Sequence, residues 1–170
     1  MAAIIPGWAT AMLGNPESGV AEGQRGQREW LATGARFWLP YFHGLLADGL
    51  AREGQAEEAL AALGEGLAWV ARTGERWSEA ELLRRKGEVL ARLGDVPGAV
   101  VALEEALRVA RGQEALMWEL RAVTSLCRLW AEGGERRKAH DTLVLVYGRF
   151  TEGFDTPDLR NTRALLDAPR

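Results

Sequence analysis

The chain has 170 residues, and 21 lysines and arginines stand against 24 aspartates and glutamates, which gives a formal net charge of −3. This balance excludes a strongly basic nucleic-acid binder, and a composition of 47% hydrophobic and 26% charged residues is that of a folded chain. No apolar run approaches a membrane span and the single Cys127 cannot form an internal disulfide, so we expect a cytoplasmic protein without membrane contacts.

The sequence repeats itself every forty residues. Glycines recur at this interval at Gly14, Gly54, Gly94 and Gly134, and a small residue follows each of them five positions later, at Gly19, Ala59, Ala99 and Ala139. A glycine that ends one helix, followed by a capping residue such as Asn15 or Asp95, is typical of a tight turn between helices. Each repeat therefore predicts two helices joined at the glycine, with the small residues allowing close packing.

The first unit, residues 1–35, is predicted to be truncated. Pro6 limits its first helix to an apolar stub of about two turns, which contains Ile4, Ile5, Trp8 and Met12. Such a stub needs a partner, because an uncapped repeat exposes an apolar face. We expect either that the chain is a piece of a longer protein whose preceding repeats cover this face, or that these four residues form a self-association surface.

Three complete units follow, at residues 36–75, 76–115 and 116–155, and a capping segment occupies 156–170. In the third unit, the segment LVLVY at 143–147 has the composition of a strand, but its place in the forty-residue register favours a helix. Thr156 and Pro157 are typical of a helix start, and a final helix is expected over 157–167.

Motifs for catalysis are absent from this sequence. His43 and His140 lack a second ligand at metal-binding spacing, and no phosphate-binding loop occurs. Cys127 occupies a small-residue position of the repeat, which favours a buried structural thiol. The basic runs at 84–86 and 136–138 alternate with acidic residues, so we predict solvated, salt-bridged helix faces. We expect no catalytic residue, no metal and no cofactor.

The pattern resembles the tetratricopeptide repeat (TPR) family, whose motif spaces a small residue, a turn glycine and two further small residues as in Gly87, Gly94, Ala99 and Ala106. The family's usual unit has about 34 residues, so this is a longer variant. The segments GARFWLPY (34–41), TGERW (73–77) and GFDTPDL (153–159) look like the C-terminal helical repeat region of bacterial signalling ATPases and nucleotide cyclases. The resemblance implies an all-α fold: a right-handed α-α superhelix of about three and a half helical hairpins with a C-terminal capping helix.

In this family the first helix of each hairpin lines a concave groove. The resemblance places eleven residues of this chain there, with Trp8 at the truncated end: Tyr41, Asp48, Arg52, Glu81, Arg84, Glu88, Arg92, Arg121, Thr124, Arg128 and Glu132. Among them, Arg84, Arg121 and Arg128 are expected to pair with acidic side chains or a terminal carboxylate of a partner, and Tyr41 or Trp8 to supply an aromatic anchor.

The resemblance thus implies a non-catalytic protein-interaction module, the sensor or partner-binding arm of a bacterial signalling or transcription-regulatory system, which binds a peptide or domain in its groove. Two alternatives stay open. One is a homodimer formed through the N-terminal helix. The other is a small-molecule sensor that uses tryptophan-lined space between the hairpins.

Overall fold

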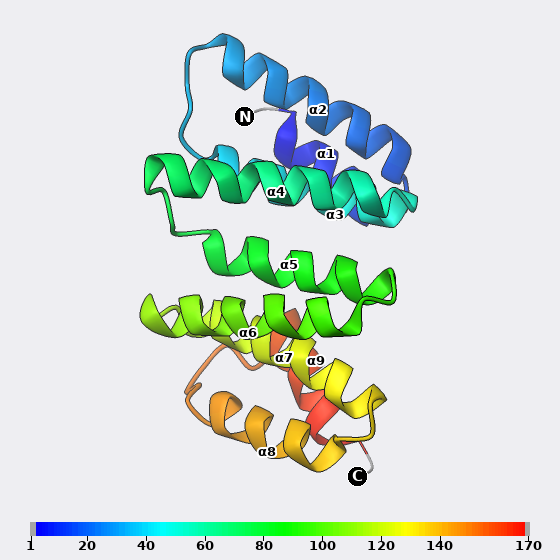
Figure 1. The fold of residues 1–170 in the computed structure, drawn as a ribbon, viewed down its shortest axis with the longest axis vertical. Helices are drawn as coiled ribbons and strands as arrows, with labels where there is room; N and C mark the ends of the chain where they lie inside the picture. The colour runs from blue at the N-terminus through cyan, green and yellow to red at the C-terminus, as the bar shows by residue number, and fades with distance from the viewer. Residues whose placement is uncertain (1–2, 169–170) are drawn as a thin grey trace.

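The structure is a computed structural model that describes residues 3–168. These residues form helices and no strand; the helices are α1 (Ile4–Met12), α2 (Pro16–Ala32), α3 (Leu39–Glu53), α4 (Ala56–Thr73), α5 (Glu79–Arg92), α6 (Val96–Gly112), α7 (Leu116–Glu132), α8 (Arg136–Tyr147) and α9 (Pro157–Leu166). Successive helical pairs stack on one another into an elongated array with the termini at opposite ends (Figure 1). The pairs α3–α4, α5–α6 and α7–α8 fall within 36–75, 76–115 and 116–155.

Glycines in a left-handed conformation make the turn inside each pair. The φ angles of Gly14, Gly54, Gly94 and Gly134 are 103°, 88°, 84° and 90°. A side chain would be strained in this conformation, so the forty-residue spacing of glycine is explained by the backbone geometry of the turns. Asp95 caps α6 as predicted, since its carboxylate accepts a hydrogen bond from the Gly98 amide at 3.0 Å. The Asn15 side chain makes no such bond to α2.

Close approach between paired helices explains the other phased small residues. A Cβ atom on Gly87 would lie 2.6 Å from Leu103 Cγ, and one on Gly19 would lie 2.5 Å from the backbone nitrogen of Ala11. Both distances are shorter than van der Waals contact, so the helices could not pack this closely around a larger residue. The predicted packing role of Gly87 is confirmed.

The N-terminal helix is partly covered by the chain itself. α1 runs through Pro6 as a short helix and packs against α2 and α3. Ile4 is buried beside Leu39 and Phe42, whereas the neighbouring Ile5 keeps 44% of its surface exposed. The apolar stub therefore contributes to the core of the first hairpins on one side and reaches solvent on the other.

The C-terminal segments are helical, as the repeat register predicts. The strand-like residues 143–147 lie in α8, and Leu143 is buried among side chains of α7 and α9. α9 packs on α7 and α8 through the buried Leu159, in the place where the first helix of a further pair would stack. Thr156 is the N-cap residue of α9, but its side chain accepts no hydrogen bond from the first turn of the helix. Its hydroxyl donates instead to the Gly153 carbonyl at 2.7 Å.

Candidate partner-binding groove

A groove runs along one side of the array. It consists of two adjoining hollows of about 250 and 190 Å³, which share Asp48, Arg84, Arg85 and Glu88. All of the lining residues come from α1, α3, α5, α7 and α9, the first helix of each pair and the capping helix. Because the second helices contribute nothing to the lining, the groove is the surface that α1, α3, α5, α7 and α9 share.

Glu81 is a buried acidic residue in the floor of the larger hollow. Its side chain is only 2% exposed, and its two carboxylate oxygens accept hydrogen bonds from Arg84 at 2.8 Å each. Arg85 on the same helix and Arg121 on α7 approach the same carboxylate, with N–O distances of 3.3 and 3.6 Å. One buried acidic group thus holds three guanidinium groups from two repeats.

Further ion pairs extend this network across the groove. Arg85 reaches Asp48 on α3 at 3.2 Å, and Asp48 also accepts a hydrogen bond from the Trp8 indole at 3.0 Å. Arg84 pairs with Glu88, which in turn accepts a hydrogen bond from Ser125 on α7. The floor is therefore a continuous ionic layer from α1 to α7, and the network fixes its side chains before any partner arrives.

The two buried carboxyl groups respond to this layer in opposite directions. Burial alone would raise the pKa of Glu81, but the hydrogen bonds and charges of the surrounding arginines outweigh it and leave the pKa below its ordinary value. At Asp48 burial is the larger effect, so the pKa is raised although Arg85 and the Trp8 indole oppose the shift. Glu81 is therefore the more firmly ionised of the two.

The capping helix closes the C-terminal end of the groove. Asp158 at its start accepts a hydrogen bond from Arg121 at 2.7 Å, and Thr162 one turn later is 3.1 Å from Thr124, oxygen to oxygen. Because Arg121 pairs with Asp158 and Glu81, its charge is satisfied by this chain. Residues of α9 thus occupy a place where a partner would otherwise contact α7.

Three exposed arginines at the groove make no ion pair among residues 3–168: Arg52, Arg92 and Arg128. Arg52 Nε lies 3.0 Å from the Met12 sulfur. Across both hollows, six arginines face four carboxylates, a local excess of two positive charges in a chain of net charge −3. The paired floor holds three arginines and four carboxylates, so the positive charge of the groove is on Arg52, Arg92 and Arg128.

Most of the residues that the family resemblance places in the groove do line it. Tyr41 and Glu132 do not: Tyr41 packs against the Trp77 ring at 5.0 Å, and Glu132 lies beside a separate hollow between α7 and α8. The resemblance predicts that Arg84 and Arg121 pair with acidic groups of a partner. In the structure both pair with carboxylates of the same chain. The resemblance missed the other lining residues, namely Met12, Ala51, Arg85, Val89, Leu120, Ser125, Asp158, Asn161 and Thr162.

The prediction of a solvated face at 84–86 is wrong for its first two residues. Arg85 is 6% exposed and Arg84 is mostly covered, because α5 is flanked by α3 and α7 on this side. The salt bridge between Glu81 and Arg85 that the spacing indicates does form. In the second run, Lys138 is exposed and pairs with Glu135 at 3.1 Å, as expected for a solvated face.

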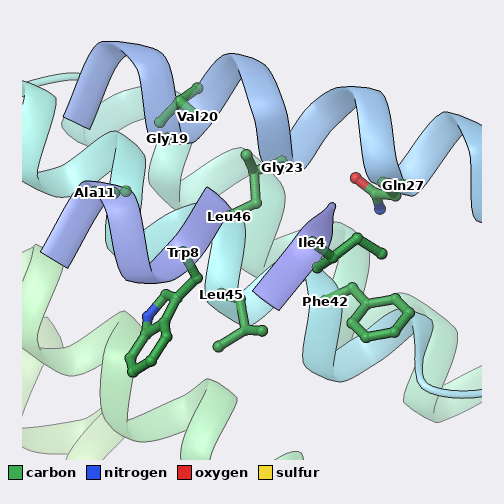
Figure 2. A pocket seen from close by; sticks show the side chains of 11 residues that line it. Ile4, Trp8, Ala11, Gly19, Val20, Gly23, Gln27, Phe42, Leu45 and Leu46 are labelled. Atoms are coloured by element: carbon green, nitrogen blue, oxygen red, sulfur yellow. The ribbon is translucent and has the colours of Figure 1, made fainter. Parts of the chain in front are cut away.

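Of the four residues assigned to self-association, only Ile5 is exposed. Ile4 is buried, and Trp8 and Met12 are half-buried beside the groove. The tryptophan-lined space that a small-molecule sensor would need is filled at this end of the chain: Trp8, Ile4 and Phe42 leave a hollow of about 10 Å³, the size of one water molecule (Figure 2). A larger hollow of about 440 Å³ between α7, α8 and α9 has no tryptophan in its lining.

Cys127 is buried, and its thiol donates a hydrogen bond to the Ala139 carbonyl at 3.1 Å. Burial raises the pKa of this thiol from 9.0 to about 12. At neutral pH we expect Cys127 to react with iodoacetamide about a thousandfold more slowly than an unhindered thiol, and to react normally in denaturant. Mass spectrometry of the alkylated protein measures this, and rapid labelling of the folded chain would contradict a structural role.

His43 also has a structural environment. It is buried, its Nε2 atom lies 3.1 Å from the Gln27 amide nitrogen, and burial lowers its pKa against the opposing charge of Glu65. Within residues 3–168, no three histidine, cysteine or acidic side chains gather closely enough to hold a metal ion. None of the helices in that range combines the length and the apolar character needed to cross a bilayer.

Comparison with solved structures decides the fold. The crystal structure of the TPR-like repeats of a putative kinesin light chain from Podospora anserina aligns with 97% of this chain and 82% of its own, at 18% identity and a TM-score of 0.70. A second crystal structure, of a single-residue variant of that protein, gives the same identity and coverage with a TM-score of 0.72.

This chain has a TPR-like fold. The predicted fold class, an all-α right-handed superhelix of helical hairpins, is confirmed. No protein-family model and no curated protein matches the sequence. In TPR-like terms, α1, α3, α5 and α7 are the first helices of successive hairpins, and the groove they line with α9 is the concave surface.

Proposed function

We propose that this chain is a non-catalytic protein-interaction module whose concave groove binds an acidic segment of a partner protein. The observation that carries the proposal is the set of three exposed, unpaired arginines, Arg52, Arg92 and Arg128, beside an ionic floor that is already paired within the chain. A TPR-like fold supports the scaffold role in general.

Chemistry favours a carboxylate-rich partner. A guanidinium group presents donors in a planar fork that matches a carboxylate, and such charge-assisted bonds are stronger than neutral ones. The paired floor limits the entropy lost on binding, because Glu81, Arg84 and Arg85 do not need to be ordered by the partner. An acidic segment that lies across α3, α5 and α7 meets one free arginine from each repeat.

The biological setting belongs to the same proposal. The resemblance to the helical repeat region of bacterial signalling ATPases and nucleotide cyclases supports a role as a sensor or partner-binding arm. A cytoplasmic location and a bacterial source stay predictions. Self-association through the N-terminal helix also stays a prediction, with Ile5 as the exposed residue available to it.

A selection from a random peptide library displayed on phage tests the groove. We expect the selected peptides to be enriched in aspartate and glutamate, and the triple substitution Arg52→Glu, Arg92→Glu, Arg128→Glu to weaken their binding by at least about a hundredfold, since each charge-assisted contact is worth about 1.5–3 kcal/mol. Isothermal titration calorimetry with the tightest peptide measures the effect.

A matched triple variant controls for overall charge. Arg25→Glu, Arg108→Glu, Arg137→Glu makes the same change in net charge at exposed arginines of α2, α6 and α8, which lie outside the groove. Its binding is expected to equal that of the unmodified chain. The proposal fails if both triple variants lose the same affinity, or if the selected peptides carry no excess of acidic residues.

A further inference from the structure

Aromatic side chains gather on a surface outside the groove hollows. Phe37, Trp38 and Trp77, here called the aromatic edge, are 55%, 38% and 41% exposed. They lie in the α2–α3 and α4–α5 connections, which run along the same side of the array (Figure 1). The Trp38 ring centroid is 6.1 Å from that of Phe37 and 6.2 Å from that of Trp77, so the three rings form one continuous apolar surface across two repeats.

A carboxylate is held within this surface. Glu75 Oε1 accepts a hydrogen bond from the Trp38 backbone amide at 2.8 Å and another from the Trp77 indole nitrogen at 3.0 Å. Both hydrogen bonds go to the same oxygen atom. Among residues 3–168, no lysine, arginine or histidine forms an ion pair with Glu75, so its negative charge is not neutralised within the described chain.

The cations nearest in sequence to Glu75 and Trp38 are engaged elsewhere. Arg36 donates hydrogen bonds to two backbone carbonyl oxygens, Arg76 pairs with Glu79 at 2.6 Å, and Arg72 Cζ lies 4.4 Å from the centroid of a tryptophan ring on its own helix. Glu75 is therefore a half-buried carboxylate held by the Trp38 backbone amide and the Trp77 indole, and no cation of residues 3–168 forms an ion pair with it.

The backbone of the aromatic edge is also unusual. Trp38 has a φ angle of 66°, a left-handed conformation that a bulky residue adopts only where its surroundings hold it there. The bond from its amide to Glu75, 37 residues away, supplies that restraint. The Trp38 ring packs on the buried Phe42 ring, with centroids 6.3 Å apart, and keeps 38% of its surface exposed.

We propose that the aromatic edge binds an arginine or lysine side chain of a partner protein. A guanidinium or ammonium group placed on the Trp38 and Trp77 rings gains a cation–π contact, and the Glu75 carboxylate supplies the opposite charge. The charged group that the Trp38 amide and the Trp77 indole hold at this surface is a carboxylate, whereas the unpaired groups of the groove are arginines, so we expect a basic side chain as its occupant. The inference does not depend on the proposed binding of an acidic segment.

Titration with a short peptide tests the inference. The probe is acetyl-Gly-Arg-Gly-amide, and its matched control is the same peptide with citrulline, which has nearly the shape of arginine but no charge. In ¹⁵N–¹H spectra of the full chain, we expect the arginine peptide to shift the Trp77 indole N–H signal with an affinity about tenfold above that of the citrulline peptide.

Glu75→Gln separates charge from structure. A glutamine keeps an oxygen acceptor for the Trp38 amide and the Trp77 indole, so the fold is expected to survive, and the affinity for the arginine peptide is expected to fall about tenfold. Glu57→Gln, at an exposed glutamate of α4, is the matched control and should leave the affinity unchanged. If Glu75→Gln lowers the melting temperature, Trp77→Leu provides a second variant that removes a ring and keeps the carboxylate. Binding to this variant is followed at the Trp38 indole N–H signal, and the affinity for the arginine peptide is expected to fall about tenfold.

Three results would overturn the inference: equal affinity for the arginine and citrulline peptides, an unchanged affinity in a folded Glu75→Gln variant, or shifts confined to groove signals. The groove variant Arg52→Glu, Arg92→Glu, Arg128→Glu should bind the arginine peptide at the aromatic edge as the unmodified chain does. Failure at the aromatic edge therefore leaves the groove proposal intact, and failure at the groove leaves this one intact.

Discussion

Replacing Glu81 by glutamine is expected to destabilise the folded chain by about 3 kcal/mol, because breaking a buried ion pair leaves uncompensated charges in a poorly solvated place. Three arginines surround this carboxylate, and Arg84 donates two hydrogen bonds to it. Glutamine has the same shape but no negative charge, so the loss reports the ionic network and not a cavity. Urea denaturation followed by circular dichroism measures the change in the free energy of unfolding.

Glu105→Gln is the matched control for this substitution. Glu105 and Arg108 on α6 form the same two-bond pair three residues apart, but at an exposed position. Solvent and salt weaken such surface pairs, so we expect no resolvable change in stability. Equal effects of the two substitutions would show that the groove floor contributes no more than a surface pair.

The contribution of ionised Glu81 to the free energy of unfolding depends on pH. Its pKa in the folded chain lies below the ordinary value of 4.5. A carboxyl group whose pKa is lowered by folding stabilises the fold at pH values above its unfolded-state pKa. This stabilisation is lost as the pH falls through the folded-state pKa. The stability difference between the unmodified chain and Glu81→Gln is therefore expected to be constant near neutral pH and to shrink below pH 4.5.

Replacing Gly19 by alanine is expected to destabilise the chain by about 3 kcal/mol, the upper end of the usual cost of overpacking. The added Cβ would lie 2.5 Å from the Ala11 nitrogen and 2.5 Å from the Gly7 carbonyl oxygen. Both are backbone atoms, which cannot move aside as the end of a flexible side chain can. The substitution must therefore push α1 away from α2, and thermal unfolding should show a lower melting temperature.

Gly64→Ala is the control because it makes the same chemical change in another helix. Gly64 lies inside α4, and nothing is within 4 Å of the position that its Cβ would occupy. Alanine loses less conformational entropy than glycine on helix formation, so this variant should be more stable by about 0.5–1 kcal/mol. If both substitutions changed stability in the same direction, the close approach of α1 and α2 would not explain Gly19.

Local chemistry made the fold predictable from the sequence. Phased glycines mark the turns because only glycine adopts their backbone conformation without strain, and the turn at Gly94 with its cap at Asp95 is an example. The register also identified α8 as a helix although residues 143–147 have strand propensity. For the turn at Gly94 and for α8, the prediction depends on comparing repeats, because neither segment alone indicates its structure.

The contents of the groove were less predictable, since they depend on which helices meet. The spacing of Glu81 and Arg85 indicates a salt bridge, but not that α3 and α7 bury it. Asp158 pairs with Arg121 only because α9 packs against the last hairpin. Likewise, Trp38 adopts its left-handed conformation beside Glu75, at the far end of the same repeat, and no local motif predicts that contact.

Hydrogen–deuterium exchange with and without the tightest acidic peptide tests the groove as the binding surface, because it maps where a partner lies along the array. We expect slower exchange in the last turns of α3, α5 and α7, which carry Arg52, Arg92 and Arg128, and unchanged exchange in α2, α6 and α8. Protection confined to α2, α6 and α8 would contradict the assignment of the concave groove as the binding surface.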